Sequence, residues 1–256
     1  MPTKIGVVGD IMLGDQPVKT GFGLYSKYNG KYQQLFEEVR PWLKTFDFVI
    51  GNFEGVLTEK IVEVHPDHSP MKVPVNALPH LKAIKIKVLS IANNHTMEYG
   101  SDSFYHMCDL LTANDFITVG HKRRPYEIIN HRGNNIGVLS FSTIPALYGY
   151  EPEYYFLDVP DPDGRTQLLS QVREVKARCN YLIILPHWGY EFVGLPSEQQ
   201  LELSKDLIAA GADIIVGAHP HIIQKAYFIH QTPVVFSAGN FISDYWQERI
   251  KRNLLV

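Results

Sequence analysis

Short runs of apolar residues recur along the chain and alternate with longer segments whose apolar residues fall near helical spacing. The short runs predict strands at 4–8, 47–51, 86–91, 116–119, 136–141, 181–185, 213–217 and 233–237. The longer segments predict helices at 31–44, 102–113, 164–178 and 198–210. Strands that alternate with helices in this way are typical of a layered α/β architecture.

Two of these helices carry recognisable end signals. Ser197 and Gln200 fit a capping box at the start of 198–210, and Gly211 stands where a C-terminal cap is expected. Ser101 is the expected cap of 102–113.

Polar residues with metal-binding or catalytic chemistry follow several of the predicted strands. They are Asp10, Asn52, Glu54, Asn94, His95, His187, His219 and His221. In open sheets, ligands bind beyond the carboxyl ends of the strands, so parallel strands would bring these side chains to one rim. Taken singly, a strand-end Asp or Asn is more often a turn former or a cap, and it is the joint pattern that indicates a site.

His219 and His221 are separated by one residue at a strand end, which is a suitable pair of metal ligands. Carboxylates beside several imidazoles suit Zn, Mn or Fe better than Ca or Mg. The expected ligands of one or two divalent ions are Asp10, Glu54, Asn94, His187, His219 and His221. Paired ions ~3.5–4 Å apart activate a water and stabilise the charge that develops on a phosphoryl or acyl oxygen, so the pattern predicts a hydrolase centre.

Other candidates carry weaker signals. Glu98, three residues after His95, can orient that imidazole through a hydrogen bond, although a solvated turn residue fits the pattern equally well. Arg123 and Arg124 belong to a short basic cluster that could bind an anionic substrate, and the alternative is a solvated loop. We group Asn52 with these two arginines as expected substrate contacts.

Composition narrows the class of protein. The chain has 256 residues, 45% of them hydrophobic, which fits one domain over 1–256. A formal charge of −3 gives no overall basic excess for nucleic acid binding. We expect no membrane span, because no apolar run reaches the ~18 residues required.

The two ends of the chain bear on location and completeness. The first residues lead directly into a strand, which predicts a cytoplasmic protein; a missing N-terminal anchor would instead make it membrane-associated or extracytoplasmic. Residues 252–256 read like the start of a strand, which leaves open a sequence cut short at the C-terminus.

Six segments together resemble a known family. They are Gly9-Asp10-Ile11-Met12-Leu13-Gly14, Gly51-Asn52-Phe53-Glu54-Gly55, Ala92 to Gly100, Pro186-His187-Trp188-Gly189, Gly217-Ala218-His219-Pro220-His221 and Ser237-Ala238-Gly239-Asn240-Phe241. As an ordered set they resemble the CapA (PgsA) poly-γ-glutamate capsule synthesis family, which is related to the calcineurin-like metallophosphoesterases. The resemblance implies a four-layer αββα sandwich with metals at its rim.

The resemblance also implies roles for single residues. Asp10 matches the first-strand aspartate, Glu54 the bridging carboxylate, and Asn94 the asparagine ligand. His95 matches the histidine that assists at the leaving group or oxyanion. His187, His219 and His221 match the later histidine ligands. Two departures stand out: Met12 replaces a histidine ligand of the phosphoesterases, and Gly51-Asn52-Phe53-Glu54 replaces their G-D-x-x-D.

The resemblance implies a role in poly-γ-glutamate capsule synthesis, export or processing. We expect a metal-activated water to attack a phosphoester or an amide in an anionic small molecule or in polyglutamate, with a capsule-synthesis complex as the implied assembly. Two alternatives stay open: a general phosphomonoesterase or phosphodiesterase, and a non-catalytic assembly component of polymer export.

Overall fold

Two β-sheets are packed face to face in the computed structural model, which describes residues 2–14, 23–28, 31–59, 71–158 and 161–243. The strand start expected at 252–256 lies outside the described residues. Within them, the first sheet has five strands in the order β13-β1-β2-β5-β6. These strands are β1 (Ile5–Ile11), β2 (Phe48–Phe53), β5 (Ile86–Ser90), β6 (Ile117–Val119) and β13 (Asn240–Ile242). All of their pairings are parallel, so their carboxyl ends meet at one rim.

The second sheet has six strands in the described part of the chain, in the order β11-β12-β10-β9-β8-β7. They are β7 (Tyr126–His131), β8 (Asn134–Ser142), β9 (Tyr181–His187), β10 (Ile214–Val216), β11 (Ala226–Ile229) and β12 (Thr232–Val235). The inner strands β8, β9, β10 and β12 are parallel, and antiparallel β7 and β11 flank them. A short parallel pair, β3 (Val56–Leu57) with β4 (Lys72–Val73), follows β2.

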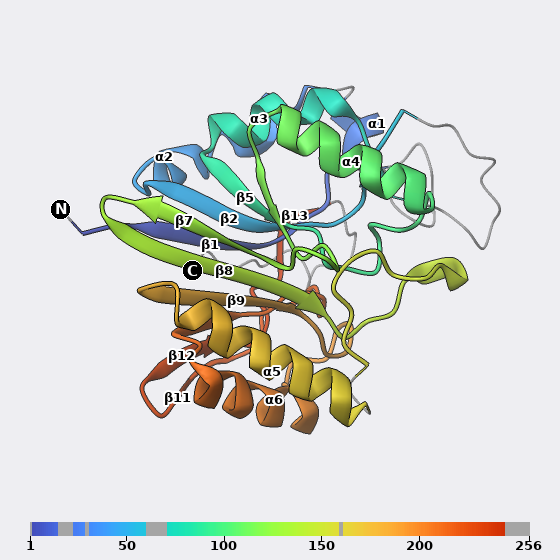
Figure 1. Ribbon diagram of the computed structural model, residues 1–256. Coiled ribbons are helices and arrows are strands. Elements are labelled where there is room, and N and C mark those ends of the chain that lie inside the picture. The colour runs from blue at the N-terminus through green and yellow to red at the C-terminus, as the bar shows by residue number, and fades with distance from the viewer. Residues whose placement is uncertain (1, 15–22, 29–30, 60–70, 159–160, 244–256) are drawn as a thin grey trace.

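Helices cover the outer faces of both sheets (Figure 1). On the side of the first sheet lie α1 (Leu24–Tyr28), α2 (Arg40–Leu43), α3 (Leu78–Ala83) and α4 (Ser101–Ala113), and α5 (Pro162–Lys176) and α6 (Glu198–Ala210) cover the second. The described residues also form three short 3₁₀ helices, η1 (Tyr32–Phe36), η2 (Val75–Ala77) and η3 (Leu147–Gly149). The four-layer αββα arrangement predicted from the sequence is therefore confirmed.

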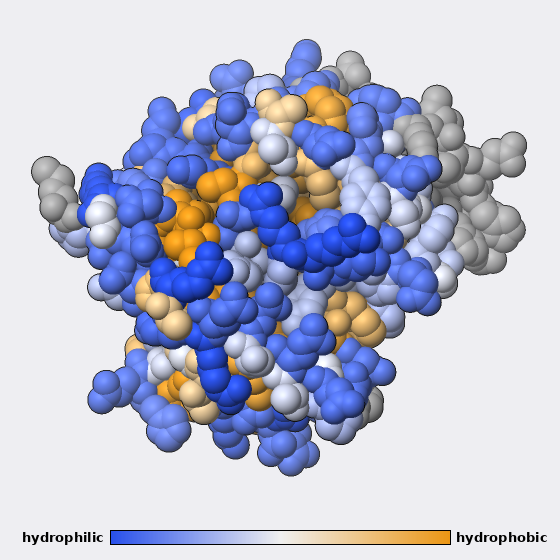
Figure 2. Space-filling model, in the orientation of Figure 1, coloured by the Kyte–Doolittle hydropathy of each residue, from blue (hydrophilic) through white to orange (hydrophobic). Residues whose placement is uncertain are grey.

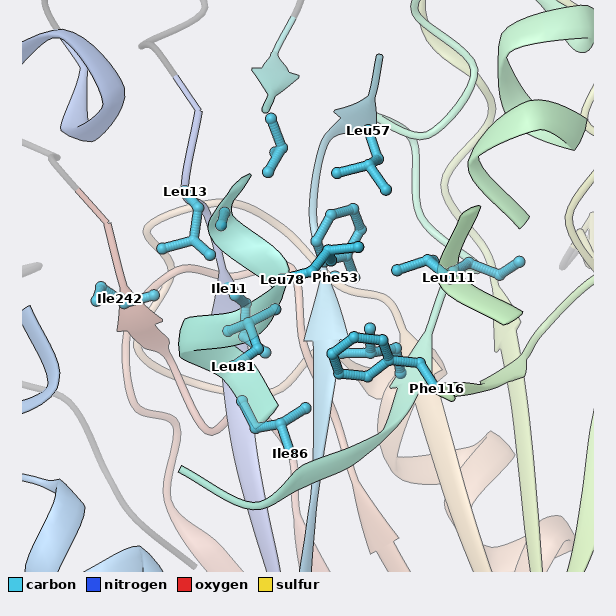
Figure 3. Close-up of a cluster of buried hydrophobic side chains, with 14 of the residues drawn as sticks. Ile11, Leu13, Phe53, Leu57, Leu78, Leu81, Ile86, Leu111, Phe116 and Ile242 are labelled. Carbon is cyan, nitrogen blue, oxygen red and sulfur yellow. The ribbon is translucent and has the colours of Figure 1, made fainter. Parts of the chain in front are cut away.

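Three apolar clusters hold these layers together. Neighbouring residues of one strand face opposite sides of the sheet, so Val49 joins the cluster under the helices while Ile50 joins the cluster between the sheets. Figure 3 shows the first of these clusters, in which Ile11 and Phe53 from the ends of β1 and β2 pack near Leu78 and Leu81 of α3. Packing against α3 therefore holds the ends of β1 and β2 in position.

The predicted helix 31–44 is wrong as a single element. The structure has η1 at Tyr32–Phe36, a turn, and then the four-residue α2 at Arg40–Leu43. Pro41 explains the break, because proline has no N–H for the helical hydrogen bond and its ring clashes with the preceding turn. The proline instead occupies the first turn of α2, where it is tolerated.

The other predicted elements are present, with shifted ends. Helix α6 has the expected capping box and Gly211 cap. Helix α4 begins at Ser101 itself and has Gly100 at the cap position, so the prediction of Ser101 as the cap is wrong. Strand β7 was not predicted from the sequence. It pairs antiparallel with β8, and Arg132 and Gly133, both with positive φ, form the two-residue turn that joins the two strands.

Much of the surface seen in Figure 2 is hydrophilic, with a smaller apolar area toward the side on which the N-terminus lies. Among the helices of the described residues, none combines the length and the apolar character needed to cross a membrane.

The inter-sheet core predicts a large effect for one truncation. Ile50 is fully buried in the cluster between the sheets, so Ile50→Ala should lower the free energy of unfolding by about 2–5 kcal/mol in urea titrations. Phe228→Ala, at a side chain that is 77% exposed, should stay within about 0.5 kcal/mol of wild type. Equal, small effects of both changes would contradict the packing described above.

Candidate metal centre

The carboxyl ends of strands from both sheets bring polar residues to the same rim. Asp10 in β1 is paired in register with Asn52 of β2 on one side and with Asn240 of β13 on the other. His187 ends β9, and Ala218 forms an isolated bridge with it just after β10. The strands that carry these residues run parallel, which is the condition under which the sequence pattern placed them at one rim.

Because neighbouring side chains of a strand face opposite sides of the sheet, the strand register decides which residues face the site. Ile11 and Phe53 point into the cluster under the helices, so their neighbours Asp10, Asn52 and Glu54 lie on the site side. Gly9 allows β1 and β13 to approach closely, since a Cβ there would lie 1.8 Å from the carbonyl oxygen of Gly239. The backbone of Asp10 donates to that carbonyl at 3.0 Å, which fixes the position of the carboxylate.

The histidine pair after β10 has an unusual backbone. His219 has φ of 96° and His221 has φ of 58°, both in the region that non-glycine residues rarely adopt. Such conformations persist only where the surrounding structure determines them, and they are common at functional sites. In this conformation His221 contacts Asp10 and Glu54, and the His219 ring lies 4.8 Å from that of His187.

Two carboxylates form the centre of the site, and both are fully buried. Asp10 Oδ1 accepts a hydrogen bond from Asn52 Nδ2 at 2.8 Å, and Glu54 Oε2 accepts one from the same amide at 3.1 Å. Burial and the nearby charge of Asp10 raise the pKa of Glu54 well above its usual value. Burial acts in the same direction on Asp10, but the contact with His221 outweighs it and lowers the pKa of Asp10.

Three buried imidazoles face these carboxylates. His221 Nδ1 lies 2.9 Å from Asn240 Oδ1 and 3.2 Å from Asp10 Oδ2, and its Nε2 is 3.6 Å from Glu54 Oε1. Although burial lowers the pKa of His221, the contact with Asp10 prevails and raises it. Burial holds the pKa of His187 well below its usual value and lowers that of His219 to about 3. His187 and His219 are thus neutral, which is the form that binds metals.

Asn94 and His95 reach the same centre from the loop after β5. Asn94 Oδ1 lies 2.8 Å from His187 Nε2, and His95 Nε2 lies 3.6 Å from Glu54 Oε1. On its other side, His95 Nδ1 lies 2.8 Å from Glu98 Oε1. Glu98 also accepts the backbone N–H of Met71, so the hydrogen bond expected between Glu98 and His95 is present and the carboxylate is itself held.

Asn52 connects the parts of the site. Its amide nitrogen contacts Asp10, Glu54 and, at 3.3 Å, His187 Nδ1. Its oxygen accepts from Asn93 Nδ2 at 3.2 Å, so both ends of the amide are used by protein groups. The structure therefore places Asn52 among the residues that orient the site, although the sequence reading grouped it with substrate contacts.

Asn93 and Asn240 were not among the site residues expected from the sequence, although Asn93 stands at the same strand end as Asn94. Both lie in motifs that carried the family resemblance, and the signal available was a polar residue at a buried strand end. Their partners, Asn52 and His221, could not be paired with them until the strands were assembled.

Arg123 and Arg124 are not brought to the centre. They lie in an exposed loop after β6, where the backbone N–H of Arg123 donates to His121 Nδ1 and Arg124 pairs with Glu127. Across the described residues, no hydrogen bond or ion pair joins either arginine side chain to the carboxylates or histidines of the site.

The donor atoms fit a divalent cation. Asp10, Glu54 and His187 each offer one atom within 4.8 Å of the others, and so do Glu191, His219 and His221. Glu54 Oε1 and His219 Nδ1 are buried and have no hydrogen-bond partner in the described part of the chain. Burying a polar atom without a hydrogen-bond partner costs free energy. Bound metal ions would supply the missing partners of Glu54 Oε1 and His219 Nδ1.

Solved structures share this fold. A phosphatase of Mycoplasma pneumoniae superposes with a TM-score of 0.57 at 12% identity, covering 93% of this chain and 72% of its own. A candidate 5′-nucleotidase of Staphylococcus aureus gives a TM-score of 0.53 at 17% identity, covering 93% of this chain and 48% of its own. At these identities the likeness establishes only that this chain shares their fold.

Sequence relatives are more specific. The capsule biosynthesis protein CapA of Bacillus anthracis is 30% identical over 98% of this chain, and the PGA biosynthesis protein CapA of Bacillus subtilis is 28% identical over 97%. The chain spans only 62% and 65% of the length of these two relatives. The family of bacterial capsule synthesis proteins named PGA_cap matches residues 4–245. Since that match includes the whole rim and both sheets, the chain belongs to the PGA_cap family of bacterial capsule synthesis proteins.

Proposed function

We propose that this chain is a metal-dependent hydrolase of poly-γ-glutamate capsule synthesis, export or processing that cleaves a phosphoester or an amide. The observation that carries the proposal is the buried Glu54 Oε1, which has no hydrogen-bond partner in the described residues and lies 3.6 Å from both His95 and His221. The capsule names of the two Bacillus relatives supply the pathway, and the donor set supplies the reaction class.

One or two divalent ions would be held by Asp10, Glu54, Asn94, His187, His219 and His221. A bound ion of this kind supplies Lewis acidity and lowers the pKa of a coordinated water. Neutral His187 and His219 and ionised Asp10 are the protonation states that such binding requires.

His95 is the group we assign to proton transfer. Its Nδ1 is held by Glu98, so its Nε2 faces the centre and can give a proton to a leaving group or stabilise an oxyanion. Glu98 fixes the orientation of the ring. This pair favours a catalytic centre over an assembly component with a structural metal, because a structural metal alone would need neither residue.

The substrate class follows from charge. A cationic centre at the rim attracts an anionic group, which fits both a phosphoester and a γ-linked glutamate chain. Arg123 and Arg124 lie on a loop at the carboxyl end of β6, and in this proposal they contact distant charged units of a longer substrate. Capsule-synthesis partners belong to the same proposal.

Metal binding should stabilise the wild type more than one isosteric variant. At a Mn²⁺ concentration about 100 times Kd, wild-type stability should rise by about 2.7 kcal/mol. Glu54→Gln should be at least as stable as wild type in chelator, because the amide removes repulsion with Asp10, and Mn²⁺ should stabilise it less than wild type, because one carboxylate ligand is lost. Thermal unfolding with and without Mn²⁺ measures both. Exposed Glu202→Gln, on α6, is the matched control and should respond as wild type does.

Metal content gives a second prediction. Protein purified without chelators should carry at least one equivalent of divalent metal, and His219→Ala should lower that amount, because the variant removes a buried ligand nitrogen. Elemental analysis measures the content. Less than half an equivalent in wild type, unchanged by the substitution, would contradict the metal-dependent reading.

Turnover separates catalysis from assembly. With nitrophenyl phosphate and γ-linked glutamate oligomers as paired substrates, His95→Gln should reduce kcat about 10²–10⁴-fold with metal content unchanged. Glu98→Gln should reduce kcat less, since it only orients His95. Full metal occupancy without turnover of either substrate in wild type would favour the non-catalytic assembly role.

A further inference from the structure

A carboxylate outside the predicted ligand set lies beside the histidine pair. Glu191 offers an oxygen within 4.8 Å of one ring nitrogen each of His219 and His221. It comes from the loop that follows β9 and is exposed, whereas both histidines are buried. The cluster therefore joins a solvent-facing carboxylate to ligands that face inward.

The loop that carries Glu191 is fastened to the segment that carries the two histidines. The N–H of Phe192 donates to the carbonyl of Pro220 at 2.9 Å, and the Phe192 ring lies 5.9 Å from that of His221. Gln224 extends this attachment, because its Nε2 donates to the carbonyls of Val193 at 2.8 Å and Leu195 at 3.2 Å. The position of Glu191 beside the histidines is thus set by the fold.

A buried nitrogen indicates a ligand at this cluster. His219 is only 6% exposed, and its Nδ1 has no hydrogen-bond partner among the described residues. A divalent ion bound by the two imidazoles would need a further donor, and Glu191 is a carboxylate in reach of both histidines.

Charge balance points the same way. Asp10 and Glu54 already place two carboxylates in a fully buried setting, and Glu191 adds a third acidic group nearby. Like charges held close together are destabilising unless cations compensate them. One divalent ion beside Asp10, Glu54 and His187 and a second beside Glu191, His219 and His221 would balance this arrangement.

We propose that Glu191 is a ligand, together with His219 and His221, of a second divalent cation. This inference rests on the proposed function, because it adds a second ion to the same metal-dependent centre. Two ions side by side would let the centre stabilise both the attacking and the leaving oxygen of the substrate.

The test is the number of Mn²⁺ ions bound by the metal-free full chain. Isothermal titration with Mn²⁺ should give two equivalents for wild type and for the control Glu202→Gln. In Glu191→Gln, the second equivalent should bind at least about 10-fold more weakly while the first is unchanged. Electron paramagnetic resonance adds a readout independent of turnover, since two nearby Mn²⁺ ions give a coupled signal that Glu191→Gln should lose.

Each other result has a distinct meaning. Two equivalents of unchanged affinity in Glu191→Gln would overturn the assignment while leaving the metal-dependent centre intact. If wild type binds only one equivalent of Mn²⁺, the proposed second metal site is wrong, whether or not Glu191→Gln still binds that ion. No bound Mn²⁺ in wild type would remove the proposed function as well. Two ions bound by wild type, with the second weakened in Glu191→Gln and no hydrolysis in either protein, would support the Glu191 assignment and count against the proposed activity alone.

Discussion

Two fully buried carboxylates, Asp10 and Glu54, lie together where the two sheets meet, and the site depends on this constraint. Charges of like sign cannot stay ionised in a buried setting without compensation. The contact between Asp10 and His221 offsets one of them, whereas Glu54 keeps an oxygen with no hydrogen-bond partner in the described residues. A cation is the simplest group that satisfies both the charge and the free oxygen.

The fold makes this unfavourable arrangement possible. Ile11 and Phe53 anchor the ends of β1 and β2 in the cluster under the helices, so their polar neighbours have no freedom to move to solvent. Asn52 then bridges Asp10, Glu54 and His187 across the two sheets. Stability gained in the apolar layers thus holds the strained histidine backbone and the buried charges in position.

Local patterns predicted many of the elements, and their failures have local causes. Short apolar runs located eight strands, and the capping box fixed the start of α6. The helix expected at 31–44 failed because Pro41 interrupts it, which the spacing of apolar residues does not reveal. Strand β13 was missed because only Phe241 and Ile242 of its three residues are apolar, yet it supplies Asn240 to the site.

The sequence by itself determined which residue types stand at the ends of the strands, because these follow from the order of apolar runs and from recognisable motifs. It therefore indicated the carboxylates and histidines of the centre and the four-layer fold. Only the tertiary structure decided which of them meet. Asn52, Asn93, Asn240 and Glu191 join the cluster through contacts between segments far apart in the chain, and Arg123 and Arg124 stay in an exposed loop of their own. Those contacts depend on strand order and loop attachment, which local spacing does not encode.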